Sequence, residues 1–330
     1  MSILALLVIS FIKILIVIVF LLTSFAYLTY IERKVQARIQ VRIGPDQAGL
    51  WGLLQPIADA IKMLMKEDII PDQADKPLFI IAPALSVIMA LCAFAAIPIG
   101  PSFTLLGYKI DMAIADINVG LLYTLAVLSL NVYGIVLGGW ASGNKYSFLG
   151  GMRSTAQMIS YELAMGMSII GVVLLGGSLN LKEIVQAQAT LPFAILQPLG
   201  FLIFFVCMFA DTNRAPFDLP EAETELVAGY HTEYSSIKYA LFYMAEYINM
   251  VTVSCLAVVL FWGGWNGPFA PGIWWLGLKV AIFIWLFMWV RASFPRFRYD
   301  HLMKFGWKLL LPLAILNVLL TAFAIAVWGS

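Results

Sequence analysis

The chain has 330 residues, of which 62% are hydrophobic and only 12% are charged, and its mean hydropathy is +0.91. Soluble domains are roughly 45–50% apolar and about 25% charged, so an apolar surplus of this size belongs in lipid. The formal net charge of +1 gives no electrostatic basis for binding nucleic acid. We therefore expect a single membrane domain over residues 1–330, with membrane lipid and no nucleic acid among its partners.

The sequence offers no metal site, and it gives no motif for a bound cofactor. The three cysteines, Cys92, Cys207 and Cys255, lie far apart in apolar segments, and we interpret them as small buried hydrophobic residues. The two histidines, His231 and His301, lie in polar stretches, which argues against a haem held between two spans. The chain also lacks a dinucleotide fingerprint, a Walker A motif and a catalytic triad. A redox cofactor, if one takes part, is expected on another chain.

Eight apolar segments are long enough to cross a ~30 Å hydrocarbon core at ~1.5 Å per residue. The first runs almost unbroken from Ile3 to Ile31, which is too long for a signal peptide. The pattern predicts an all-α polytopic membrane protein with about eight transmembrane helices. The expected spans are 3–30, 78–100, 113–139, 156–178, 191–210, 239–262, 273–291 and 308–328.

Basic residues gather in the loops after the odd-numbered spans, which hold 16 of the 20 lysines and arginines. The positive-inside rule places these loops in the cytoplasm. Both termini are then expected on the outer, periplasmic side, in agreement with an even number of spans. The cytoplasmic loops are 31–77, 140–155, 211–238 and 291–308.

The loop 31–77 opens with a dense charge cluster that includes Glu32, Arg33 and Arg38. Such a cluster at the end of a span is typical of charged side chains that snorkel to the membrane surface and anchor the helix. It is equally compatible with side chains that line a functional site. Composition alone leaves both interpretations open.

An amphipathic helix is expected later in the same loop. Gln55, Asp59, Lys62 and Lys66 form one polar stripe at helical spacing, and apolar residues occupy the opposite face. The helix either rests on lipid at the interface or roofs a hydrophobic cavity. In the second case Asp59 lies at the boundary between polar and apolar surfaces.

Two glutamates, Glu162 and Glu246, lie inside otherwise apolar spans. A charged residue at the middle of a span costs ~2.5–3.5 kcal/mol on insertion scales, so such residues usually face a polar interior or a water path. The alternative is a structural ion pair, but no basic residue lies one helical turn from either glutamate. We therefore expect both to be proton-relay candidates.

The loop 211–238 is unusually acidic, with six carboxylates within 23 residues. Carboxylates this close couple their titrations, so they behave as a buffer with several apparent pKa values. A simply solvated acidic loop is the alternative, and apolar residues such as Phe217 and Leu219 argue against it. The carboxylates are Asp211, Asp218, Glu221, Glu223, Glu225 and Glu233.

In the last basic loop, 291–308, arginines alternate with aromatic residues. Arg291, Arg296 and Arg298 belong to this pattern, which suits anchoring to lipid headgroups or a polar lining for a cavity.

These loops together resemble one family closely: the H subunits of bacterial NADH:quinone oxidoreductase, or respiratory complex I, which are counterparts of the first mitochondrially encoded subunit. The resemblance covers the whole chain, and RAPFDLPEAE is highly specific. The matching stretches are Glu32–Gly49, Gln55–Glu67, GGMRSTAQMISYE ending at Glu162, Asp211–Tyr239 and Arg291–Trp307.

The resemblance implies a membrane subunit that forms much of a quinone-binding chamber and couples quinone reduction to proton translocation in the bacterial inner membrane. Quinone is then the substrate, and FMN and iron–sulfur clusters are expected on partner subunits of the complex. The resemblance assigns Glu32, Arg33, Arg38, Asp59, Arg214, Asp218, Glu221, Glu223, Arg291 and Arg296 to the chamber. It assigns Glu162, Asp211, Glu225 and Glu246 to the proton relay.

The chain departs from the family at two places. The position of Asp211 is often Glu in relatives, so the charge is kept while the reach of the side chain changes. Some relatives also have an acidic residue deep in the third span, whereas here Asp116 lies at its outer end.

Two other functions remain alternatives at this stage. A stand-alone ion transporter would also have carboxylates within its spans, but it would usually show broken spans and internal repeats. The homologous membrane subunit of an energy-converting hydrogenase need not hold quinone. The combination of Glu32-Arg33-Lys34, PFDLPEAE and RASFPRFRYD favours the quinone enzyme over both.

Overall fold

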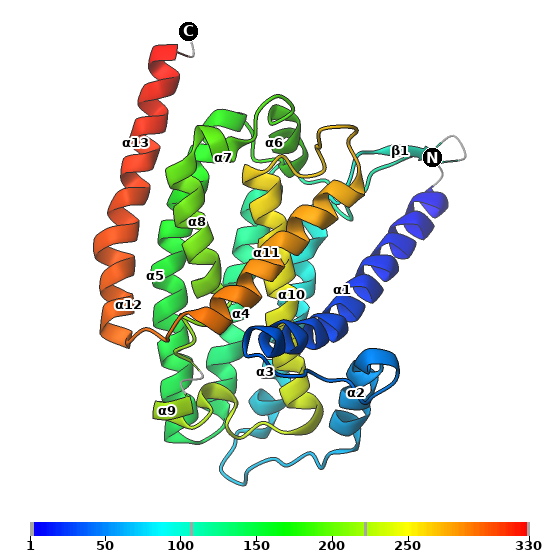
Figure 1. The fold of residues 1–330 in the computed structure, drawn as a ribbon, viewed down its shortest axis with the longest axis vertical. Helices are drawn as coiled ribbons and strands as arrows, with labels where there is room; N and C mark the ends of the chain where they lie inside the picture. The colour runs from blue at the N-terminus through cyan, green and yellow to red at the C-terminus, as the bar shows by residue number, and fades with distance from the viewer. Residues whose placement is uncertain (1–2, 106–107, 221–222, 329–330) are drawn as a thin grey trace.

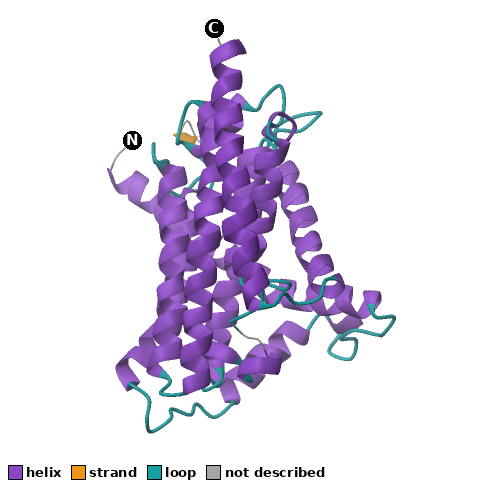
Figure 2. Cartoon of the chain, turned by 90° about the vertical axis from the view of Figure 1, so that its left-hand side faces the viewer, coloured by secondary structure: helices purple, strands orange, loops and turns teal. Residues whose placement is uncertain are grey.

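The structure is a computed structural model, which describes residues 3–105, 108–220 and 223–328. Long helices run between two layers of loops (Figure 2). The helix α1 (Ile3–Ile39) begins and α13 (Leu311–Trp328) ends at the same end of the bundle, here called the terminal end (Figure 1). The opposite end, here called the loop end, carries α2 (Gln55–Met65) and α9 (Glu223–Leu226).

The remaining elements follow the chain between these ends. A short antiparallel hairpin of β1 (Phe103–Leu105) and β2 (Tyr108–Ile110) lies at the terminal end. The other helices are η1 (Leu50–Gly52), α3 (Lys76–Ala93), η2 (Phe94–Ala96), α4 (Gly120–Ala141), α5 (Lys145–Gly176), α6 (Leu181–Ala187), α7 (Phe193–Leu196), α8 (Pro198–Asp211), η3 (Gly229–His231), α10 (Ser236–Phe261), α11 (Ile273–Ser293), α12 (Tyr299–Phe305) and η4 (Gly306–Leu310).

Within the described residues, seven helices are long and apolar enough to cross a membrane. The amphipathic helix is present as α2, whose first turn contains Pro56, a residue that fits where backbone N–H groups have no partner within the helix. The prediction of an all-α polytopic membrane protein with an additional amphipathic helix is therefore confirmed.

The fifth expected span, 191–210, differs from the prediction because it is broken at Gln197. Pro198 has no backbone N–H and pushes the residue before it out of the helical region, and Gln197 accordingly has φ −132° and ψ 61°. The 14-residue α8 that follows is only about 21 Å long at ~1.5 Å per residue. This apolar segment is thus a short helix preceded by a separate turn, α7.

Several boundaries also differ from the expected spans. The first helix runs on to Ile39, so the charge cluster expected in a loop stands on the last turns of α1. The third span begins at Gly120 rather than at 113, because the preceding backbone bonds elsewhere: Ala115 donates its N–H to the carbonyl of Ala95 at 3.0 Å. The last span begins as early as α12 and passes through the π-helical turn η4.

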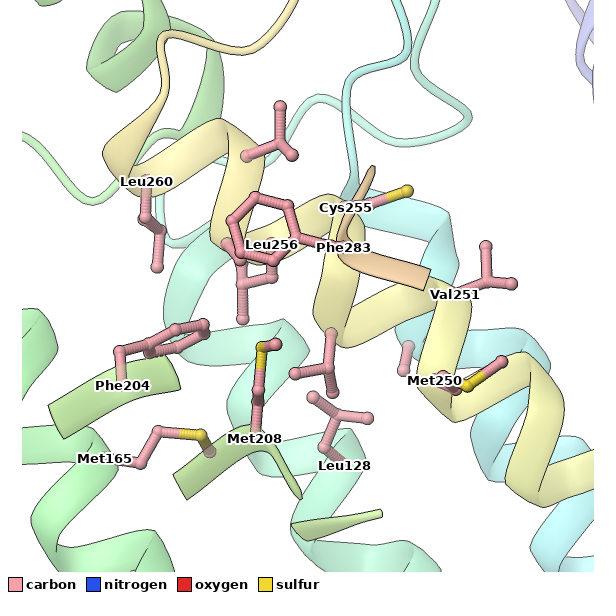
Figure 3. Packing of buried hydrophobic residues seen from close by; sticks show 14 of the residues in the cluster. Leu128, Met165, Phe204, Met208, Met250, Val251, Cys255, Leu256, Leu260 and Phe283 are labelled. Carbon is pink, nitrogen blue, oxygen red and sulfur yellow. The ribbon is translucent and has the colours of Figure 1, made fainter. Parts of the chain in front are cut away.

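The helix α10 is the centre of the bundle, and most of its side chains are buried. Figure 3 shows Met250 and Leu256 of α10 in the same apolar cluster as Met208 of α8 and Leu128 of α4. A residue on α10 therefore faces protein on nearly every side, which makes a charged side chain there dependent on partners from other elements.

Two glycines allow α4 and α5 to approach neighbouring parts of the chain closely. A Cβ atom at Gly134 of α4 would lie 2.0 Å from Ser86 Oγ of α3. A Cβ atom at Gly150 of α5 would lie 2.6 Å from the backbone nitrogen of Tyr230. The second contact brings the acidic loop 211–238 directly onto the start of α5.

Candidate functional site

Arg214, in the loop after α8, lies between two carboxylates from distant parts of the chain. Its Nη1 donates to Glu32 Oε2 of α1 at 2.6 Å, and its Nε lies 2.6 Å from Glu246 Oε1 of α10. The Arg214 side chain is only 1% exposed and that of Glu32 only 3%. The two glutamates are therefore joined through one buried guanidinium group.

Two further side chains complete this arginine–carboxylate cluster, which consists of Glu32, Arg214, Glu246, Tyr247 and Arg291. Arg291, in the last turn of α11, pairs with Glu32 Oε1, and the Tyr247 hydroxyl donates to Glu32 Oε2 at 2.8 Å. The Arg214 guanidinium also lies over the Tyr247 ring, 4.3 Å from its centroid, in cation–π geometry.

The charges of the cluster balance only when both glutamates are ionised. Two arginines then face two carboxylates, and a buried charge is tolerated when it is paired and hydrogen-bonded. Glu32 meets this condition well, because it accepts from two arginines and a tyrosine. Protonation of either glutamate would leave one buried positive charge in excess, so the cluster is sensitive to any change of charge nearby.

The position of Arg214 is set by a tight turn that α5 holds in place. Asn213 has a positive φ of 50°, and the Arg214 N–H returns to the carbonyl of Phe209 at 3.2 Å. The buried Gln157 of α5 donates through Nε2 to the carbonyl oxygens of Ala210 and Phe217, each at 2.8 Å. One side chain thus fixes both sides of the turn that carries Arg214.

Asp218 and Arg296 join the acidic loop to the last basic loop. Their side chains form an ion pair at 2.9 Å, and the Phe297 N–H donates to the carbonyl of Pro216 at 3.1 Å. Burial raises the pKa of Asp218 to about 6, although the adjacent Arg296 acts in the opposite direction. This carboxyl therefore titrates much closer to neutral pH than an exposed aspartate does.

A second group of predicted residues lies beside a cavity between α1, α2 and α10. Arg33 donates to Asp59 at 2.6 Å, and both residues line a cavity of about 390 Å³. Most of the other lining residues are apolar, among them Phe25, Leu64 and Tyr243. Of the two interpretations of the amphipathic helix, this geometry favours the one in which α2 roofs a hydrophobic cavity with Asp59 at its polar edge.

The two remaining intramembrane carboxylates, Asp211 and Glu162, lie on α8 and α5, which pack against each other. Asp211 is 6% exposed. Its Oδ1 and Glu162 Oε1 are buried with no hydrogen-bond partner among the described residues. Buried carboxylate oxygens normally have partners, so this pair is an unusual feature of the interior.

Other predicted residues do not join the cluster. Glu225 is exposed and pairs with Arg153 at 2.6 Å, and Arg38 is exposed in the last turn of α1. Glu223 begins α9, and Glu221 lies outside the described residues. Within the part of the chain that the structure describes, no group of three or more histidine, cysteine or acidic side chains could hold a metal ion.

The sequence argument against an ion-pair partner for Glu246 is wrong. No basic residue lies near Glu246 in sequence, yet Arg214 reaches it from the loop after α8 and forms an ion pair. Spacing within one helix cannot detect a partner that tertiary structure supplies. The sequence reasoning also missed the roles of Tyr247 and Gln157, whose only signal was a polar side chain within a mostly apolar stretch.

Comparison with known proteins identifies the family. The profile of the NADH dehydrogenase family matches residues 12–322. The NADH-quinone oxidoreductase H subunit of Thermomicrobium roseum is 54% identical over 94% of this chain and 93% of its own length. One of the H subunits of Geobacter metallireducens is 53% identical over 95% and 94%, and the H subunit of Protochlamydia amoebophila is 54% identical over 91% and 93%. The chain therefore belongs to the NADH dehydrogenase family, among relatives that are H subunits of NADH-quinone oxidoreductases.

Proposed function

We propose that this chain is the membrane subunit of a proton-translocating NADH:quinone oxidoreductase, in which it forms much of the quinone chamber and couples quinone reduction to proton movement. The arginine–carboxylate cluster carries the proposal. Arg214 and Glu32 at its centre are buried, its charges balance, and it joins α1, α10 and α11 to the acidic loop. A charge that appears beside such a cluster changes the interactions of several elements at once.

The chemistry of the substrate supports this assignment. Reduction of a quinone to a quinol takes two electrons and two protons, and each electron that arrives before a proton leaves negative charge on the substrate. Arg214 and Arg291 would stabilise that charge, while neighbouring carboxyl groups exchange protons with it. The electrons would come from FMN and iron–sulfur clusters on partner subunits of the complex.

The cavity under α2 supports quinone as the substrate. A quinone has a long apolar tail and a polar ring, so its site needs an apolar channel with a polar rim. This cavity has apolar walls that include Phe25 and Leu64, and Arg33 and Asp59 form its polar edge. In this proposal quinone enters from the bilayer between α1, α2 and α10. The chamber would be completed by the peripheral subunits that bind the loop end.

Glu162, Asp211, Glu225 and Glu246 are the proposed relay through which the charge change reaches the rest of the membrane domain. Asp211 and Glu162 lie in the interior next to the cluster's own loop, as a relay requires. Glu225 contributes from the surface through its pair with Arg153. The loop end is proposed to face the cytoplasm of a bacterial cell, with both termini on the periplasmic side of the inner membrane.

A stand-alone transporter is the competing function, and the broken span at Gln197 is a feature that transporters share. The near-full-length relatives argue against it, because their names place them in NADH-quinone oxidoreductases. In a native gel of membranes solubilised with a mild detergent, this chain should migrate with a very large NADH-oxidising assembly. Migration alone or as a small oligomer would contradict the proposal.

A direct test replaces Glu32 by Gln in the assembled complex. Because Glu32 is the shared partner of two arginines, its neutralisation should lower NADH:quinone turnover by about tenfold or more. NADH oxidation by a water-soluble electron acceptor, which does not need the quinone site, should be retained. Glu67→Gln, at an exposed position just after α2, is the matched control and should behave like the wild type.

A further inference from the structure

The first polar side chains of α10 bind the end of α2 instead of their own helix. Ser235 is the N-cap of α10, a position in which serine usually accepts a hydrogen bond from a backbone N–H of the helix that follows. Ser235 makes no such bond. Its hydroxyl donates to the carbonyl of Glu67 at 3.2 Å and accepts from the Ile69 N–H at 3.2 Å. The serine therefore holds the segment that follows α2.

Ser236 makes a second link, to α2 itself. Its hydroxyl donates to the carbonyl of Met63 at 2.9 Å, and the residue is 3% exposed. Met63 lies in the last turn of α2, where backbone carbonyls have no partner within the helix, so Ser236 supplies a missing donor. Ser236 also has a positive φ of 54°, which is uncommon for residues other than glycine. Such a backbone conformation persists where the surrounding contacts hold it.

Lys238 makes the third link. Its Nζ lies 2.9 Å from Asp68 Oδ2 and 5.3 Å from the centroid of the Phe79 ring, and the residue is only 8% exposed. The ion pair that Arg33 and Asp59 form nearer the start of α2 is more open to solvent, with side chains 47% and 22% exposed. Three neighbouring residues of α10 thus fix the C-terminal end of α2. They are called here the α2 anchor: Ser235, Ser236 and Lys238.

The α2 anchor lies at the edge of the cavity of about 390 Å³ between α1, α2 and α10. Met63 lines this cavity, and so do Ile237 and Tyr239, which alternate with the anchor residues along the chain. The helix α2 has only 11 residues, and its outer side chains Ile57 and Ile61 are each 53% exposed. A short helix with one face unpacked depends on contacts to other elements for its position. The anchor therefore controls the distance between the roof and one wall of the cavity.

We propose that Ser235, Ser236 and Lys238 are positioning residues that hold α2 against α10 and so keep the cavity at the width that binds the apolar tail of the quinone. The inference rests on the proposed function and deepens it. A site that adopts its binding-competent form for only part of the time loses apparent affinity in proportion. With the anchor intact, α2 is in place before quinone arrives. Without the anchor, binding of quinone must also order α2.

The test combines Ser235→Ala with Ser236→Ala in the assembled complex. The KM for a quinone with a long isoprenoid tail should rise several-fold, while kcat and NADH oxidation by a water-soluble acceptor stay unchanged. The KM for a short-tailed quinone should rise less, because its tail makes fewer contacts in the cavity. Ser235→Thr keeps the hydroxyl and should retain the wild-type KM. Ser254→Ala is the control, since the Ser254 hydroxyl donates to the Met250 carbonyl within α10.

The ion pair of the anchor provides a second, independent measurement. Lys238→Met and Asp68→Asn should each raise the KM for the long-tailed quinone. The double variant should have no higher KM than the more affected single variant, because both changes remove the same interaction. Lys66→Met removes an exposed positive charge directly after α2. It is the matched control and should retain the wild-type KM.

Each outcome supports or overturns the inference. A wild-type KM in the serine double variant and in Lys238→Met would overturn it. A fall in kcat without a change in KM, or an equal rise in KM for long-tailed and short-tailed quinones, would also overturn it, since the anchor would then support the fold and not the tail site. If Glu32→Gln has normal quinone reduction, the proposed function itself fails. If Glu32→Gln is inactive and the anchor variants have a wild-type KM, only the anchor inference fails.

Discussion

Arg214 joins Glu32 to Glu246 across the interior, with one guanidinium nitrogen 2.6 Å from a carboxylate oxygen on each side. The two glutamates are more than 200 residues apart in the chain, so this relationship exists only in the folded state. It adds a buried ionic link between α1 and α10 to their direct contact through Tyr247 and Glu32.

The first prediction concerns that side chain. Arg214→Met leaves two buried carboxylates with one arginine, and breaking a buried ion pair costs roughly 3–5 kcal/mol. The variant should lower the melting temperature of the complex and abolish quinone reduction. Arg153→Met is the control, because its pair with Glu225 is partly exposed and should contribute at most about 1 kcal/mol. Equal melting temperatures for the two variants would contradict the prediction.

The second prediction concerns pH and Asp218, whose pKa burial raises from 3.8 to about 6. Between these values the folded state binds more protons than the unfolded state, so stability falls as pH rises from about 4 to about 6 and changes little above. The shift corresponds to about 3 kcal/mol. Asp218→Asn should remove this dependence, which thermal denaturation at several pH values would measure. A parallel pH dependence in the variant and the wild type would show that another group is responsible.

The third prediction tests whether Gln157 holds the turn that carries Arg214. Gln157→Leu removes the hydrogen bonds to Ala210 and Phe217, each contributing about 1 kcal/mol. Hydrogen exchange of the backbone amides of Arg214 and Phe217 should become faster, and quinone turnover should fall. Gln188→Leu is the control, since this buried glutamine bonds the terminal-end segments instead. It should lower overall stability and leave exchange at the turn unchanged.

The fourth prediction concerns the cavity under α2. Ala60 lines it, whereas the neighbouring Ile61 does not line it and is 53% exposed. Ala60→Trp should fill part of the cavity and raise the KM for quinone several-fold, with NADH oxidation by a water-soluble acceptor unchanged. Ile61→Trp places the same side chain outside the cavity and should have no effect. A raised KM in both variants would show that the effect is not due to the cavity.

The amino-acid sequence by itself determined the class of the fold. Apolar segments of about 20 residues are long enough to cross a bilayer, where only a helix pairs all of its own backbone groups, so composition and segment length predicted a helical membrane protein. The polar stripe from Gln55 to Lys66 predicted the amphipathic helix. Helix ends were less predictable. The charged residues from Glu32 onward predicted the start of a loop. The helix α1 instead continues to Ile39, because residues elsewhere in the fold, such as Arg214, pair with these charges.

The partners of the buried charges were decided by tertiary structure alone. The sequence marked Glu246 as a charged residue in an apolar span, but its pairing with Arg214 depends on a turn that Gln157 holds from another helix. The cavity that Glu246 shares with Asp211, Asn131 and Asn249 likewise forms only where α3, α4, α8 and α10 meet the acidic loop. Periodicity along the chain predicts which face of a helix is polar. It does not predict what that face meets, because the contact is made by residues that are remote in sequence.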